Sequence, residues 1–233
     1  MFVMEDEVMK RRFYSIILTL GMVLSLFYFL GSNKALTVYA ENDLAGGITI
    51  EEEYLIPDSI DWCTYYVIVA KNSTGSDICI SADFVAKDKD GAALKKVNDY
   101  SEAVKKDQQF ILYGQFLNKE IKNALAYEYN YTVKTTDKCA YRSVMLDTKN
   151  VGKEIEVSAT NSSKFDIQSV GVRTVFMKNG KAVAFDTVNI ADTGITFRGG
   201  STNSQVIGTY AGDYDNYIMT YTSVGTQVYT EDL

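Results

Sequence analysis

The chain of 233 residues contains no histidine. Histidine is the usual base of Ser-His-Asp triads and Cys-His dyads, and imidazole is the commonest metal ligand near neutral pH. Those catalytic and metal centres are therefore excluded. Two carboxylates can still converge in any acidic protein, but their spacing here singles out no pair. We expect a protein that is not an enzyme, with no catalytic residue, no cofactor and no metal site.

Cysteine is also scarce, with only Cys63, Cys79 and Cys139. Because three is an odd number, at least one thiol is free or pairs with another chain. If the strands on either side of the 72–77 turn pair directly, Cys79 faces Ala70, and Cys63 lies roughly 23 Å away at the rise of a strand. That separation is far beyond disulfide reach. The partner of Cys139 stays open, and we expect free, unreactive thiols.

Basic side chains are outnumbered, since 23 Lys and Arg against 30 Asp and Glu give a net charge of −7. Residues 1–40 hold four of the bases and three of the acids, which leaves 19 and 27 for the rest and a net charge of −8. An acidic surface repels a phosphate backbone, so nucleic acid is not an expected partner.

The one long apolar run lies near the N-terminus. Three basic residues at 10–12 precede an uncharged apolar segment over 13–30, and Val38 and Ala40 supply the small residues of a cleavage site. These are the parts of a bacterial signal peptide over residues 1–40. An uncleaved anchor is the alternative, with 13–30 as the membrane contact. Either reading makes the rest of the chain secreted or places it on the extracellular face of the membrane.

The remainder contains a repeat with an offset of 89 to 90 residues. Asn, Ser, Gly and Asp cluster in turns between apolar runs, where their side chains satisfy backbone groups. The matching segments are Ala70-Lys-Asn72-Ser73-Thr-Gly-Ser-Asp77-Ile78 with Ala159-Thr-Asn161-Ser162-Ser-Lys-Phe-Asp166-Ile167, Lys89-Asp90-Gly91 with Lys178-Asn179-Gly180, and Tyr127-Glu-Tyr129-Asn-Tyr131 with Tyr217-Ile-Met219-Thr-Tyr221.

Between the turns, apolar residues alternate with polar ones, which is typical of half-buried antiparallel strands. In the second unit Val170, Val172 and Phe176 share a face, and their phase is slipped by one residue relative to that of Ile78, Ile80, Ala82 and Phe84 in the first unit. This slip predicts a β-bulge. The expected strands are 48–56, 62–71, 78–87, 92–98, 108–117 and 125–134, then 140–147, 154–161, 168–177, 181–189, 195–207 and 216–223. Two charged stretches, 99–106 and 117–124, are expected to be turns or short helices.

The pattern predicts an all-β protein with two tandem immunoglobulin-like antiparallel β-sandwiches after an N-terminal apolar helix. The first sandwich spans 44–134 and the second 140–224, joined by a connector at 135–139 and followed by a tail at 225–233.

The order of strands and turns resembles the bacterial FxLYD family of extracellular immunoglobulin-like domains. The segment Lys106-Asp-Gln-Gln-Phe110-Ile111-Leu112-Tyr113-Gly114 is similar to the signature strand of that family, with Gly114 where Asp would stand. The second unit keeps only Phe197, in Ile195-Thr-Phe197-Arg-Gly-Gly. The resemblance covers roughly residues 60–224 and implies a sandwich on an exported protein, without catalytic residues.

Tyrosine is abundant, with 17 residues, many of them in the last strand of each unit. Tyr127, Tyr129 and Tyr131 alternate with polar residues, which predicts a buried face. Trp62 shares the phase of Tyr66 and is expected in the core. Exposed rings are expected instead in the Gly- and Asp-rich loop, whose candidate ligand-binding residues are Tyr210, Asp213, Tyr214, Asp215 and Asn216.

Two functions follow from this organisation. The first is a non-catalytic cell-surface module that serves as a spacer or as an adhesion domain for an unknown protein. The alternative is a carbohydrate or cell-wall binding module, in which the loop tyrosines stack on sugar rings. A weak calcium site lined by Asp213, Asp215 and Asn216 is a further use of that loop.

Overall fold

A computed structural model describes residues 38–40, 43–192, 194 and 197–226. The predicted apolar helix over 13–30 and most of the tail at 225–233 lie outside the described residues. Within the described part of the chain, no helix is long and apolar enough to span a membrane.

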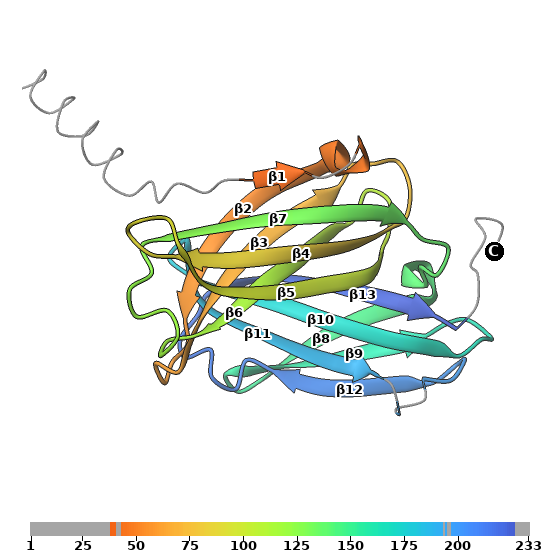
Figure 1. The fold of residues 1–233 in the computed structure, drawn as a ribbon. Coiled ribbons are helices and arrows are strands. Elements are labelled where there is room, and N and C mark those ends of the chain that lie inside the picture. The colour runs from red at the N-terminus through yellow and green to blue at the C-terminus, as the bar shows by residue number, and fades with distance from the viewer. Residues whose placement is uncertain (1–37, 41–42, 193, 195–196, 227–233) are drawn as a thin grey trace, which may run out of the picture. The chain divides into compact units, whose positions relative to one another are not determined.

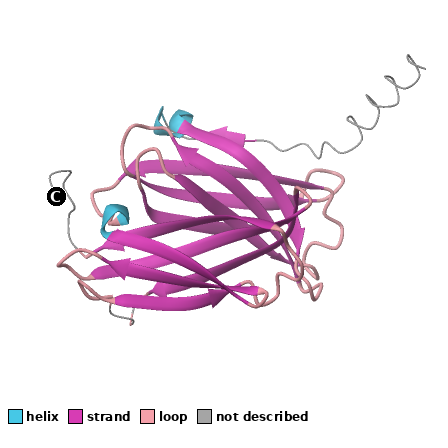
Figure 2. Ribbon diagram, turned by 180° about the vertical axis from the view of Figure 1, so that it is seen from behind, coloured by secondary structure: helices cyan, strands magenta, loops and turns pink. Residues whose placement is uncertain are grey.

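The described chain is built almost entirely of strands, with two short 3-10 helices (Figure 2). The first sandwich consists of sheet I, in the order β1-β7-β4-β5, and sheet II, in the order β2-β3-β6. Their strands are β1 (Val38–Ala40), β2 (Ile48–Pro57), β3 (Cys63–Asn72), β4 (Ile78–Lys87), β5 (Ala93–Val104), β6 (Gln109–Leu117) and β7 (Ala126–Thr135), and the helix η1 (Asp43–Gly47) precedes β2.

The second sandwich repeats this order (Figure 1). It consists of sheet III, in the order β11-β10-β13, and sheet IV, in the order β12-β9-β8. Its elements are η2 (Tyr141–Ser143), β8 (Val144–Val151), β9 (Glu154–Asn161), β10 (Ile167–Lys178), β11 (Lys181–Ala191), β12 (Thr202–Ile207) and β13 (Asn216–Gly225). In both halves the first, second and fifth long strands form one sheet, and the third, fourth and sixth form the other.

Alternation along the strands builds a separate core in each sandwich. Every second residue of β4 is buried, from Ile78 to Ala86, and these side chains face the apolar face of sheet II. Tyr127, Tyr129 and Tyr131 join this core, which confirms the prediction for them. In the second sandwich, β9 and β10 supply the corresponding aliphatic residues around Phe176 and Phe197.

The two asparagines of the sequence repeat hold equivalent positions. Asn72 is fully buried, and its side-chain amide donates to the carbonyls of Ser76, Val104 and Lys105 at 2.8, 3.3 and 3.0 Å. Its Oδ1 accepts the N–H and the hydroxyl of Thr74. The side chain therefore ties the loop after β3 to the loop before β6.

Asn161 makes the same contacts in the second sandwich. Its amide donates to the carbonyls of Phe165 and Phe197 at 2.8 and 3.1 Å, and its Oδ1 accepts the N–H and the hydroxyl of Ser163. It is also fully buried. The turn motif thus marks a buried clamp between two loops, beyond the local turn that the sequence predicts.

A third core lies between the two sandwiches, where sheet II packs on sheet III. Ile56, Val67, Val69 and Ile111 from sheet II contact Val175 and Phe185 from sheet III, and all six are buried. Sheet II is therefore covered on both faces, and the sheets stack in the order I, II, III, IV (Figure 1).

An ion pair crosses the same interface. The guanidinium of Arg173 on β10 donates to both carboxylate oxygens of Asp99 on β5, at 2.6 and 2.8 Å, and to the carbonyl of Ile111 at 2.6 Å. The central carbon of the guanidinium, Cζ, lies 5.0 Å from the centroid of the Tyr113 ring. Bidentate pairing of this kind fixes orientation as well as distance, so the two sandwiches are held together by directional bonds in addition to apolar contact.

Most predicted strands are present within a few residues of their expected ends. The bulge is confirmed, because the pairing of β10 with β13 shifts between Ile167 and Ser169. The stretch 117–124 is a series of turns, as expected. The stretch 99–106 is not: β5 continues to Val104, because it pairs with β4 along its whole length and Asp99 is neutralised by Arg173.

Two further expectations are wrong. The strands on either side of the 72–77 turn do not pair, because β3 lies in sheet II and β4 in sheet I, so Cys79 lies opposite Lys134 and not Ala70. Trp62 is 56% exposed and not in the core, because it lies in the turn before β3 and not on the strand itself.

Strand β1 was not predicted. It pairs in parallel with β7, with Val38 opposite Tyr129 and Ala40 opposite Tyr131. These three residues fall within the predicted signal peptide, so the predicted cleavage after Ala40 would separate β1 from the rest of the first sandwich.

Candidate binding site at the junction of the sandwiches

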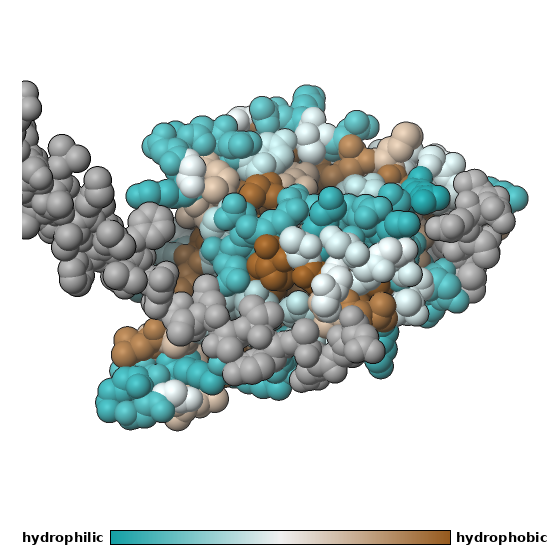
Figure 3. Space-filling model, turned by 90° about the horizontal axis from the view of Figure 1, so that it is seen from above, coloured by the Kyte–Doolittle hydropathy of each residue, from teal (hydrophilic) through white to brown (hydrophobic). Residues whose placement is uncertain are grey.

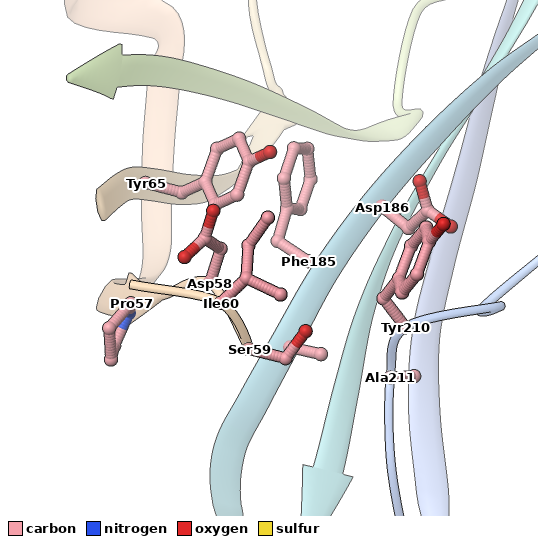
Figure 4. A pocket seen from close by; sticks show the side chains of 10 residues that line it. Pro57, Asp58, Ser59, Ile60, Tyr65, Phe185, Asp186, Tyr210 and Ala211 are labelled. Carbon is pink, nitrogen blue, oxygen red and sulfur yellow. The ribbon is translucent and has the colours of Figure 1, made fainter. Parts of the chain in front are cut away.

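A small cavity opens where one end of the first sandwich meets the second (Figure 4). Its volume is about 140 Å³. Four parts of the chain line it: the end of β2 with the following turn, the start of β3, the middle of β11, and the loop after β12. The lining residues are Pro57, Asp58, Ser59, Ile60, Tyr65, Ala184, Phe185, Asp186, Tyr210 and Ala211.

Aromatic rings form the floor of the cavity. Phe185 from the second sandwich packs against Tyr65 and Tyr113 from the first, with ring centroids 5.2 and 4.8 Å apart. Burial, followed by the hydrogen bond with Cys63, raises the pKa of Tyr65 above its ordinary value. The floor is therefore uncharged at neutral pH and suits an apolar group.

Two exposed apolar side chains stand at the rim. Ile60 is 74% exposed and Tyr210 is 76% exposed, although both line the same cavity. Trp62, from the same turn as Ile60, adds a third exposed apolar side chain nearby in the sequence. Scattered single apolar residues are common on surfaces, but a group beside a concave site is typical of an interaction surface.

Hydrogen bonds fix the turn that carries Ile60. Asp58 accepts the N–H of Trp62 at 2.7 Å and the N–H of Cys63 at 3.1 Å. Asn118 donates to the carbonyl and to the carboxylate of Asp61, which adopts a positive φ of 56°. The turn is thus pre-organised with its apolar side chain toward solvent.

The loop that carries Tyr210 is fixed in a similar way. Asp186 on β11 accepts the N–H of Gly208 at 2.8 Å, and Gly208 has a positive φ of 90°. Asp186 also accepts the N–H of Thr187. Both carboxylates at the cavity, Asp58 and Asp186, are therefore engaged on backbone amides.

The five residues predicted for a ligand loop do not form one site. Tyr210 lines the cavity, whereas Tyr214 is half-buried against Phe176, with ring centroids 4.8 Å apart. Asp213 forms an exposed ion pair with Lys178 at 3.0 Å, and this cation lowers the pKa of its carboxyl.

The other two residues shape the backbone. Asp215 accepts the N–H of Asn179 at 2.9 Å, and Asn216 accepts the N–H of Tyr217 at 2.8 Å. Asp213 is thus paired with a lysine of the chain, and Asp215 stabilises a turn. Within the described residues, no group of three or more acidic or cysteine side chains is placed to hold a metal ion.

Sequence reasoning missed most of the lining. Ile60 follows Ser59 and precedes Asp61, and an isoleucine between polar turn residues was a usable signal, because such a turn gives it no core to enter. Phe185 and Asp186 carried no such signal. They belong to an ordinary alternating strand, and only the stacking of sheet II on sheet III brings them to the cavity.

The three cysteines are free thiols. Burial raises the pKa of Cys139 to about 12 and raises the pKa of Cys63. A thiol is nucleophilic as its thiolate, so these two thiols, protonated at neutral pH, are poor nucleophiles.

Comparisons with known proteins find no close relative. No protein-family model matches the chain, and no curated protein matches it. Among solved structures, it is similar to the transglutaminase of red sea bream, with 8% identity and a TM-score of 0.26, over 74% of this chain and 29% of that chain. The chain thus spans less than a third of the transglutaminase.

Two other solved structures are also only weakly similar to the chain. A β-glucuronidase of glycoside hydrolase family 2 is 12% identical, with a TM-score of 0.17, over 71% of this chain and 20% of that chain. Native α-2-macroglobulin from Escherichia coli, spanning domains NIE-MG1, is 8% identical, with a TM-score of 0.17, over 68% of this chain and 95% of that chain. Likenesses this weak carry no argument about function.

Proposed function

We propose that the chain after residue 40 works outside a bacterial cell as a rigid, non-catalytic pair of immunoglobulin-like sandwiches that binds a protein partner. The immunoglobulin-like assignment is supported by the two-sheet strand order of each half and by the resemblance to FxLYD-type domains. The location rests on the basic and apolar segments of residues 10–30.

The observation that carries the binding proposal is the exposure of Ile60 and Tyr210 beside an uncharged aromatic floor. A cavity of about 140 Å³ is small, since sites for whole small molecules have roughly 300–1,000 Å³. It fits a single apolar side chain of a partner. Interfaces draw most of their binding energy from such anchors in small pockets, surrounded by contacts that exclude water.

Rigidity supports the spacer part of the proposal. The Arg173–Asp99 pair and the apolar contact of sheet II with sheet III fix one sandwich on the other. A module of this kind presents its loops in constant positions. Pre-organised loops bind with a smaller loss of conformational entropy than loops that must order on contact.

The non-catalytic part is supported by the state of the two carboxylates at the cavity. Asp58 and Asp186 each accept backbone N–H groups and so hold the loops in place. A general acid or base has to face a substrate with a proton to exchange. These carboxylates face the chain itself.

The test compares residues 37–233 with the variant Ile60→Ser/Tyr210→Ala in capture of proteins from the producer's cell envelope, with crosslinking. We expect at least one protein whose saturable capture falls about tenfold or more in the variant, because hot-spot residues contribute 2 kcal/mol or more. Met145→Ser is the matched control, since Met145 is 56% exposed on β8, away from the cavity. Equal capture by all three proteins would overturn the proposal.

A carbohydrate-binding function is the second candidate, and the exposed rings of Tyr210 and Trp62 favour it. Aromatic rings stack on sugar faces through flat apolar area. The same proteins are therefore applied to insoluble glycans and to the producer's cell walls. Saturable binding to a glycan that is lost in Tyr210→Ala and kept in Met145→Ser would replace the protein partner with a sugar.

A further inference from the structure

The two sandwiches differ at one edge of equivalent sheets. In sheet I, β7 is covered on its outer edge by β1. In sheet III, β13 holds the position of β7, and no strand of the described residues covers its outer edge. The neighbouring contacts are alike in the two sandwiches. The hydroxyl groups of Tyr131 and Tyr221 donate to the carbonyls of Ala45 and Tyr141, each in the adjacent 3-10 helix. The difference is therefore confined to the strand edge.

Part of the β13 edge is already occupied by other segments. Gln108, from the loop before β6, donates its side-chain amide to the carbonyl of Tyr221. The connector bonds farther along: the N–H of Ala140 donates to Ser223 at 3.0 Å, and the N–H of Gly225 donates to Lys138 at 2.8 Å. The second half of the strand edge is thus closed.

The first half of the edge is open. In an antiparallel strand, alternate residues direct their N–H and C=O groups away from the neighbouring strand. The carbonyls of Tyr221 and Ser223 point away from β10, so Tyr217 and Met219 are the preceding outward positions. The N–H of Tyr217 donates to Asn216. The Tyr217 carbonyl, both groups of Met219 and the Tyr221 N–H have no partner among the described residues.

A groove of about 550 Å³ runs along these open groups. Tyr217, Met219 and Tyr221 are half-buried on its wall, whereas Tyr127, Tyr129 and Tyr131 at the equivalent places of the first sandwich are 5%, 1% and 4% exposed. The opposite wall is formed by Leu146 and Thr148 of β8, and the loop 105–109 closes one end. The second core is therefore incompletely covered beside the open edge.

We propose that this groove binds an extended polypeptide segment of a partner protein, which adds to β13 as a parallel strand. The first sandwich supplies the template, because β1 is a three-residue parallel strand on the equivalent edge of β7. Strand addition uses main-chain hydrogen bonds for affinity and alternate side chains for specificity. This site lies on another part of the molecule than the junction cavity and does not depend on it.

Three residues are enough to satisfy the open edge. With the register of β1 on β7 moved by the repeat offset of 90, Val38 would stand opposite Met219. In a parallel ladder the residues before and after it then bond. The peptide residue before Val38 donates its N–H to the carbonyl of Tyr217 and accepts the N–H of Met219. The peptide residue after Val38 donates its N–H to the carbonyl of Met219 and accepts the N–H of Tyr221. All four open groups gain partners.

The experiment uses residues 37–233, which contain every described contact of both sandwiches, and a labelled peptide with the sequence of residues 35–42 as the probe. We expect saturable binding by fluorescence anisotropy. Met219→Pro removes the outward N–H without touching the bonds to β10, and it should weaken binding about tenfold or more, as expected for losing one or two hydrogen bonds. Met219→Ala keeps the amide and should retain binding within about threefold, since only side-chain contact changes.

Backbone methylation of the peptide supplies a second readout. Methylation of the Tyr39 amide blocks a bond to Met219 and should abolish binding, whereas methylation of the Val38 amide, which faces away from β13, should not. Equal binding by the wild type and Met219→Pro would overturn the proposal and indicate exchange with β1 on β7. Binding that appears only after deletion of residues 227–233 would also overturn it, because the tail would then be the occupant.

Discussion

The two sandwiches share a strand order and a buried asparagine clamp, yet one of them has a closed edge and the other an open one. In the first, β1 and η1 cover β7, and its three tyrosines are buried. In the second, the equivalent side chains on β13 are half-buried beside a groove. The clamp is therefore a feature that the two sandwiches share, whereas their sheet edges differ.

The comparison also separates two kinds of contact. Contacts within each half follow the repeat, because they satisfy backbone groups that every such sandwich has. Contacts between the halves do not repeat, since Arg173 and Asp99 occur once. Substitutions can therefore test the shared clamp, the unique junction and the differing faces one by one.

The largest effect is expected from breaking the junction. Arg173→Ala leaves Asp99 without its cation between the sandwiches, and the free energy of unfolding should fall by about 3 kcal/mol. Urea unfolding of residues 37–233, followed by tyrosine fluorescence and circular dichroism, measures the loss. Lys96→Ala removes the cation of an exposed pair with Asp83 and is the control, with a loss under about 1 kcal/mol. Equal losses would show that the junction pair does not hold the halves together.

Next come the two clamps. Asn72→Ala and Asn161→Ala each leave buried backbone groups without partners, and each should lower the free energy of unfolding by about 2–3 kcal/mol. The same urea titration measures both. Similar losses would confirm that the clamps are equivalent. A loss under about 0.5 kcal/mol in one variant only would contradict the equivalence.

A smaller effect is expected at Gly114. A methyl group there would lie 2.6 Å from Cβ of Phe84 in the first core, so Gly114→Ala should cost about 1–3 kcal/mol. Gly171 on β10, a strand glycine of the second sandwich, is the control, because a methyl group there meets its nearest atom, of Asn189, at 3.5 Å. Gly171→Ala should change stability by less than about 1 kcal/mol. The order of melting temperatures of the two variants checks this.

The smallest effect is a pH dependence that belongs mainly to the first core. Burial, followed by the charge of Glu53, raises the pKa of Tyr129 above the unfolded value of about 10. The folded state thus favours the neutral phenol. Its stabilisation is complete below about pH 10 and is lost as the pH rises from there toward the folded pKa.

Tyr129→Phe should therefore make the fall of unfolding free energy between about pH 10 and pH 11 shallower, by up to about 1.4 kcal/mol per pH unit. Urea midpoints at several alkaline pH values give the slope. Tyr210→Phe, at an exposed ring, is the control for losing one phenol. A Tyr129→Phe slope no shallower than that of the control would contradict the assignment.

Strand positions could be predicted because period-two alternation reports one buried face, as in β4 with Ile78, Ile80, Ala82, Phe84 and Ala86. The stacking of the sandwiches could not. Its one signal was the unbroken apolar run from Tyr66 to Ala70, which is typical of a strand buried on both faces. That run predicts that another layer covers the second face of β3, but it does not identify the strands that form this layer.

The candidate site was predicted less well than the fold. Tyr210 is exposed, as expected. Apart from its neighbour Ala211, the other cavity residues come from β2, the turn after it, β3 and β11, and the two sandwiches bring these elements together only at their junction. On the face shown in Figure 3, hydrophobic patches lie separately among hydrophilic side chains. Composition alone therefore gives no indication of which patch lies beside a concavity.

Strand β1 links the sheet edge of the first sandwich to the predicted cleavage point. Its three residues are the last ones before that point, so removal of residues 1–40 would leave β7 without its covering strand. Under the proposal that the chain is exported and cut after Ala40, this processing would be a maturation step, because it would uncover a second strand edge that can pair with another chain.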